Sequence, residues 1–69
     1  MTEDPKQLVQ RKIRSLVYLH GVHVKSLTGL EINPEAEYKR IYAECQAGLI
    51  TLSDIQADIN EYLKMRENV

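Results

Sequence analysis

Apolar side chains recur at steps of three and four residues along most of this chain, the spacing that places them on one side of an α-helix. In the first half, one such face is formed by Val9, Ile13, Leu16, Val17, His20, Val24 and Leu27. Alternation at period two is never sustained for more than a few residues, so no β-strand is predicted. The pattern therefore indicates an all-α protein.

The first helix is predicted over residues 5–26. Asp4 before Pro5 is a typical start, because the carboxylate accepts from a free backbone N–H and proline needs no donor there. Gly21 interrupts the helix at a cost of about 1 kcal/mol relative to alanine. The segment after His20 is consequently expected to be the weaker part, and a break at Gly21 stays open.

The second helix is predicted over residues 34–47, after a joint that we place at residues 26–37. Gly29 marks the exit from the first helix, and Asn33 before Pro34 caps the second. Gly48 supplies the left-handed conformation that commonly ends a helix. The side chains expected on the inner face are Tyr38, Ile41, Tyr42, Cys45 and Leu49.

The third helix is predicted over residues 53–66, with Thr51 or Ser53 as its cap. Its inner face is expected to carry Ile55, Ile59, Tyr62 and Leu63. Few residues separate it from the second helix, so we expect these two to be antiparallel neighbours, with Leu49, Ile50 and Leu52 filling the end between them. The fold predicted is one all-α domain over residues 1–69: a small three-helix protein with a long basic first helix followed by an antiparallel helical pair.

The size of the chain points to a partner. A domain of 69 residues buries only about 60% of the surface that its unfolded chain exposes, so its core is marginal. Cys45 is its single cysteine, which excludes an internal disulfide; on the inner face of its helix we interpret it as a core residue. Association with another protein is the remaining common way to stabilise so small a scaffold.

Charge is distributed unevenly. Residues 1–30 carry five basic and two acidic side chains, a net charge of +3, whereas residues 31–69 carry four basic and eight acidic ones, a net charge of −4. The two halves either attract each other within the fold or present the first helix as a basic surface for nucleic acid. The overall pI of about 6.1 makes a nucleic-acid binder the less favoured of the two.

The chain contains no apolar run near the ~20 residues that span a bilayer, and its polar, acidic start is unlike a signal peptide. We therefore expect a cytoplasmic protein with no membrane partner. His20 and His23 are three residues apart, but a zinc site with Cys45 would need further ligands at defined spacing, so no metal is predicted. The carboxylates occur mostly singly and no phosphate-binding glycine loop is present. An enzyme, a cofactor and a small-molecule substrate are not expected.

The order of motifs resembles a known family. A basic helix, then Leu-x-Gly-Leu-Glu-x-Asn-Pro, then a helix ending in Ala-Gly-Leu-Ile-Thr-Leu-Ser-Asp is similar to the VbhA-type antitoxins of Fic-domain toxins. The matching positions are Leu27, Gly29, Leu30, Glu31, Asn33, Pro34, Gly48, Leu49, Ser53 and Asp54. The resemblance implies a short helical protein that wraps around a toxin, an enzyme that transfers AMP from ATP onto target proteins.

The sequence departs from the pattern of this family at the inhibitory residue. The family's inhibitory helix carries a Ser or Thr, three residues, a Glu, and then Gly or Asn, and the glutamate pairs with an arginine in the ATP site of the toxin. This chain has Val24 at the first position and Thr28 at the glutamate position. A threonine hydroxyl cannot replace the charge-assisted pairing of a carboxylate with arginine. Glu31, three residues later and past Gly29, could substitute only if the chain leaves the helix in a way that turns it back toward the inhibitory site.

The function predicted is that of an antitoxin-like protein that binds and restrains a Fic-domain toxin through the first helix and the joint, by obstruction or through Glu31. The alternatives are a phage- or plasmid-type adaptor or inhibitor acting on another protein and, less favoured, a nucleic-acid binder. The predicted partner-binding residues are Arg14, His20, Val24, Lys25, Leu27, Thr28, Gly29, Leu30 and Glu31.

Overall fold

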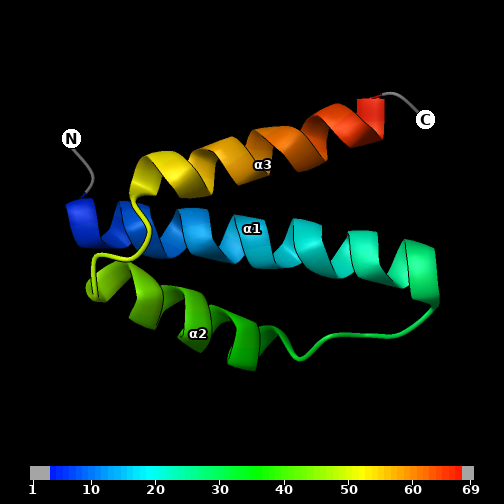
Figure 1. Cartoon of the computed structure of the whole chain (residues 1–69), viewed down its shortest axis with the longest axis horizontal. Helices are drawn as coiled ribbons and strands as arrows, with labels where there is room; N and C mark the ends of the chain where they lie inside the picture. Colours follow the sequence, from blue (N-terminus) through cyan, green and yellow to red (C-terminus); the bar gives the residue numbers. More distant parts are fainter. Residues whose placement is uncertain (1–3, 68–69) are drawn as a thin grey trace.

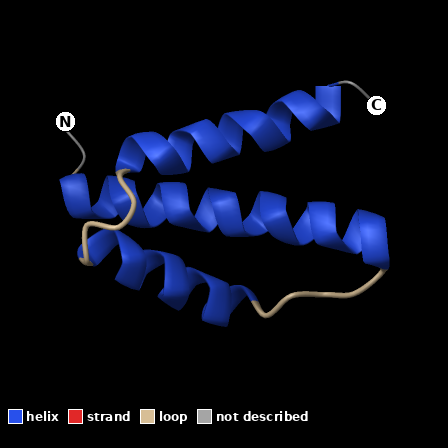
Figure 2. Ribbon diagram, viewed as in Figure 1, coloured by secondary structure: helices blue, strands red, loops and turns tan. Residues whose placement is uncertain are grey.

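The computed structural model describes residues 4–67, and the ends of the predicted 1–69 domain, residues 1–3 and 68–69, lie outside this range. It contains three helices, α1 (Pro5–Thr28), α2 (Pro34–Gln46) and α3 (Leu52–Glu67), joined by two loops (Figure 2). These bounds lie within two residues of those predicted, and the all-α, three-helix fold is confirmed.

The long helix α1 lies between the other two (Figure 1). It contacts both α2 and α3, whereas α2 and α3 touch each other only slightly. The two outer helices run in opposite directions, as predicted, but α1 separates them over most of their length. The antiparallel pair is therefore held together mainly through α1.

The core follows from this central position. Its buried side chains are Ile13, Leu16, Val17, Leu19, Ile41, Ile55 and Ile59. Ile13 on α1 and Ile55 on α3 are almost completely enclosed. Leu19 lies outside the predicted stripe and is buried nonetheless, because a helix with a neighbour on each side buries a wider face than one stripe.

Side-chain caps explain where the helices begin. The Asn33 carboxamide oxygen accepts from the N–H groups of Glu35 and Ala36 at 3.1 and 3.3 Å, at the start of α2. Before α3, the N–H of Thr51 donates to the Asp54 carboxylate at 2.9 Å, and the N–H of Asp54 donates to the Thr51 hydroxyl at 3.2 Å. This reciprocal arrangement is a capping box, which assigns the cap to Thr51 and not to Ser53.

Three leucines predicted to face inward are exposed, so these predictions were wrong. Leu27 is 72% exposed because it lies in the last turn of α1, which extends beyond α2 (Figure 1), and only the end of α3 lies near it. Leu49 is 75% exposed because the left-handed Gly48 turns the chain away from α2, leaving Ile50 to pack against the core. Leu63 is 43% exposed because it lies at an open hollow between α1 and α3 that Leu19 and Ile59 also line.

Gly21 does not break α1, which continues to Thr28. A β-carbon at this position would lie 3.4 Å from Cγ1 of Ile32, a half-buried residue of the loop before α2. Ile32 therefore packs against the helix at Gly21, at a distance where a β-carbon would be in ordinary van der Waals contact with it. This contact fixes how the loop returns along α1.

Candidate protein-interaction site

The predicted interaction residues centre on the α1 exit, which we define as residues 24–32. Gly29 adopts a left-handed conformation with φ of 76°, and its N–H donates to the Lys25 carbonyl at 2.9 Å. Glycine is the residue that adopts this conformation without a steric penalty, so it ends α1 and reverses the chain. The turn brings the loop back beside the helix it has just left.

Thr28 stabilises this turn with its hydroxyl group. The hydroxyl donates to the carbonyl of Val24 at 2.8 Å and accepts from the N–H of Leu30 at 3.1 Å. One side chain thus bonds back to a carbonyl one turn earlier in the helix and satisfies a donor of the loop. Thr28 therefore has a local structural role in this chain.

Glu31 is turned back onto α1 by the same reversal. Its carboxylate lies 2.9 Å from Nζ of Lys25, and both side chains are largely exposed. The hydrogen bond and the charge of Lys25 lower the pKa of the Glu31 carboxyl below its usual value. Exposed ion pairs contribute only ~0–1 kcal/mol, so this pair orients two charges and adds little stability.

Two aliphatic side chains project from this turn. Leu27 is 72% and Leu30 is 69% exposed; Leu27 directly precedes Thr28, and the N–H of Leu30 donates to the Thr28 hydroxyl. Leu27 is two residues from Lys25 in the sequence, and Leu30 directly precedes Glu31. The α1 exit therefore presents apolar side chains beside one positive and one negative group, on a backbone fixed by hydrogen bonds.

Two predicted site residues lie away from the α1 exit. The guanidinium of Arg14 lies 4.4 Å from the centre of the Tyr38 ring on α2, a cation–π contact in the first half of α1. His20 is half-buried on α1, with Nδ1 3.8 Å from a carboxylate oxygen of Glu37 and its ring 6.1 Å from that of Tyr62. The structure thus brings residues 24–31 together but leaves Arg14 and His20 in separate places.

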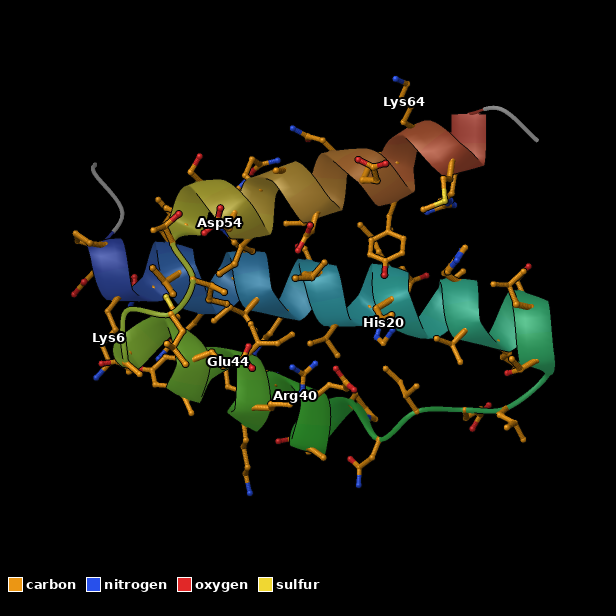
Figure 3. The ribbon with its side chains drawn as sticks, in the orientation of Figure 1. Lys6, His20, Arg40, Glu44, Asp54 and Lys64 are labelled. Carbon is orange, nitrogen blue, oxygen red and sulfur yellow. The ribbon has the colours of Figure 1, made fainter. Side chains whose placement is uncertain are left out.

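His20 lies in a cleft of about 400 Å³ between α2 and α3, which we call the α2–α3 slot. Its walls include carboxylates from both outer helices, and Arg40 on the α2 wall pairs with Glu37 at 2.8 Å (Figure 3). His23 contacts the ring of Tyr62 with centroids 5.4 Å apart. Burial, and then the charges of nearby carboxylates, raise the pKa of the Tyr62 phenol.

Within residues 4–67, no three His, Cys, Asp or Glu side chains are placed to hold one metal ion. Cys45 is half-buried and packs against the core, as its position on the inner face of α2 predicted. None of the three helices in the described part of the chain combines the length and the apolar character needed to cross a membrane.

Sequence reasoning missed several exposed apolar residues on α1. Tyr18 is 66% and Val22 42% exposed, on the face of the helix opposite the predicted stripe. Their spacing of four residues places them on one face, which was the signal available in the sequence. This spacing indicates an exposed apolar face only because α1 is the central helix and this face of it is left open.

Comparisons of this chain with protein families, curated proteins and solved structures found no match.

Proposed function

We propose that this chain is a non-enzymatic protein that binds a partner protein through the α1 exit, in the manner of the VbhA-type antitoxins that it resembles. The observation that carries the proposal is the pair of exposed leucines, Leu27 and Leu30, on a turn held in place by Thr28 and Gly29. Apolar side chains on a preorganised turn lose little conformational entropy on binding.

The size of the contribution can be estimated from the exposure. Burying a whole leucine side chain is worth about 1.5–3 kcal/mol, so covering the exposed parts of Leu27 and Leu30 contributes about 2–4 kcal/mol together. A micromolar complex requires about 8 kcal/mol after the cost of association. The α1 exit is therefore one anchor of an interface that extends over more of the molecule.

The partner that we propose is a Fic-domain toxin, on the basis of the motif order around the joint. Thr28 offers no carboxylate for the arginine in the toxin's ATP site, and its hydroxyl is engaged with Val24 and Leu30. The Glu31 carboxylate is engaged with Lys25. These contacts favour inhibition of the toxin by steric obstruction. Glu31 pairs with the toxin arginine only if that arginine displaces Lys25.

The test is co-expression with the protein encoded beside this chain, after inspection of that reading frame for a His-Pro-Phe motif followed by a glycine-rich anion hole. The purified complex is assayed for auto-AMP transfer. We expect Thr28→Glu to strengthen inhibition about 10- to 100-fold, since a charge-assisted hydrogen bond contributes about 1.5–3 kcal/mol. Leu27→Asn combined with Leu30→Asn should weaken the complex about 30-fold or more.

Two further variants separate obstruction from pairing. Glu31→Gln should leave inhibition unchanged if obstruction operates, and should reduce it if Glu31 pairs with the toxin. Glu61→Gln is the control, because it removes an exposed carboxylate that belongs to α3 and lies outside residues 24–32. If the neighbouring reading frame lacks the Fic motif, the partner is a different protein. The same surface would then serve the adaptor function.

Nucleic-acid binding is less well supported by the contacts. Of the basic side chains on α1, Arg14 stacks on Tyr38 and Lys25 pairs with Glu31. Arg11 also has an interaction within the chain. A nucleic-acid complex would have to compete with these contacts, and its affinity would fall steeply with salt.

A further inference from the structure

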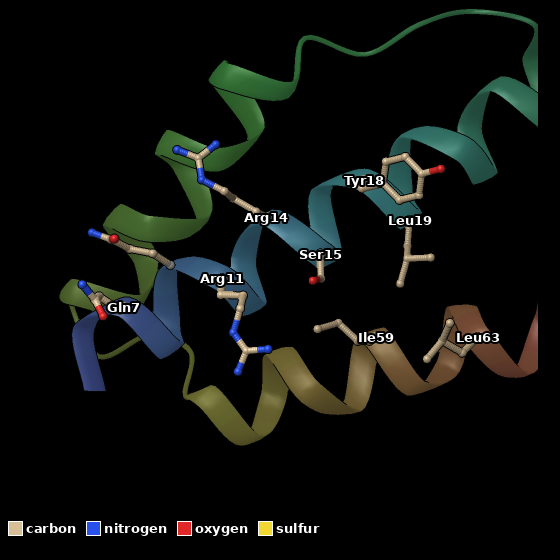
Figure 4. A pocket seen from close by; sticks show the side chains of 9 residues that line it. Gln7, Arg11, Arg14, Ser15, Tyr18, Leu19, Ile59 and Leu63 are labelled. Atoms are coloured by element: carbon tan, nitrogen blue, oxygen red, sulfur yellow. The ribbon is translucent and has the colours of Figure 1, made fainter. Parts of the chain in front are cut away.

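We draw no further inference here: the strongest candidate, the open hollow of about 670 Å³ between α1 and α3 that Leu19, Ile59 and Leu63 line (Figure 4), exposes apolar side chains, but nothing in the described part of the structure shows what covers them.

Discussion

Replacing each glycine of the chain by alanine should have opposite effects at different positions. Gly21 lies inside α1, where alanine is favoured over glycine by about 1 kcal/mol. The added β-carbon would lie 3.4 and 3.5 Å from Cγ1 and Cδ1 of Ile32, which is ordinary van der Waals contact. We therefore expect Gly21→Ala to stabilise the fold by about 0.5–1 kcal/mol.

At Gly29 and Gly48 the backbone conformation determines whether alanine stabilises or destabilises the fold. Both have positive φ angles, 76° and 77°, and a β-carbon at either would meet no atom within 4 Å. A residue with a β-carbon pays about 1–2 kcal/mol in this conformation, partly offset by the lower entropy of the unfolded chain. Gly29→Ala and Gly48→Ala should each destabilise the fold by about 1 kcal/mol.

The assay is urea unfolding followed by circular dichroism. For a domain of this size the unfolding free energy falls by roughly 1 kcal/mol per molar urea, so each effect corresponds to a midpoint shift of about 1 M. Gly21→Ala should move the midpoint up, and the other two variants should move it down. Gly21→Ala in an Ile32→Ala background isolates helix propensity from the contact with Ile32.

Two outcomes would refute this reasoning. A clear loss of stability in Gly21→Ala that disappears in the Ile32→Ala background would mean that Ile32 cannot accommodate the methyl group. An unchanged midpoint in Gly29→Ala would mean that the left-handed turn does not determine the end of α1.

Further predictions concern charge and packing. The carboxyl group of Glu31, followed by nuclear magnetic resonance, should titrate at a pH below the usual glutamate range, and Lys25→Met should return its pKa to that range. The stability that this ion pair contributes is present above the pKa of Glu31 in the unfolded chain. It is lost as pH falls through the pKa of Glu31 in the folded chain. Because the pKa of Tyr62 is raised, stability should decline as pH rises above about 10, and Tyr62→Phe should flatten that decline in urea unfolding. Ile13→Ala should cost about 2–5 kcal/mol by the same measurement, whereas Leu27→Ala should cost under about 0.5 kcal/mol, and similar losses would contradict the assigned burial.

Local signals made the helices predictable. Asn33 and Gly48 act within one turn of the chain, so their effect on helix ends is visible without knowledge of the rest of the molecule. The inner positions Ile41, Ile55 and Ile59 were also identified, because helical spacing defines which side chains share a face.

Whether a side chain near one end of a helix is buried was less predictable. Leu27 shares the face of Ile13, but only the end of α3 lies near it, and the spacing of side chains carries no information about the length of a neighbour. The pairing of Lys25 with Glu31 was also missed, because it depends on the path of the loop beyond Gly29. The open hollow between α1 and α3, which Leu19 and Leu63 line, was missed as well, because it depends on the order in which the helices pack.

The central position of α1 also has a consequence for local opening. Because α2 and α3 make only slight contact with each other, either outer helix can detach while the other stays docked on α1. Amide protons in the middle of α1 exchange only when both have left, so they should be the slowest in native-state hydrogen exchange. The shorter α2 should exchange faster than α3, which would make the chain two cooperative units that share one helix.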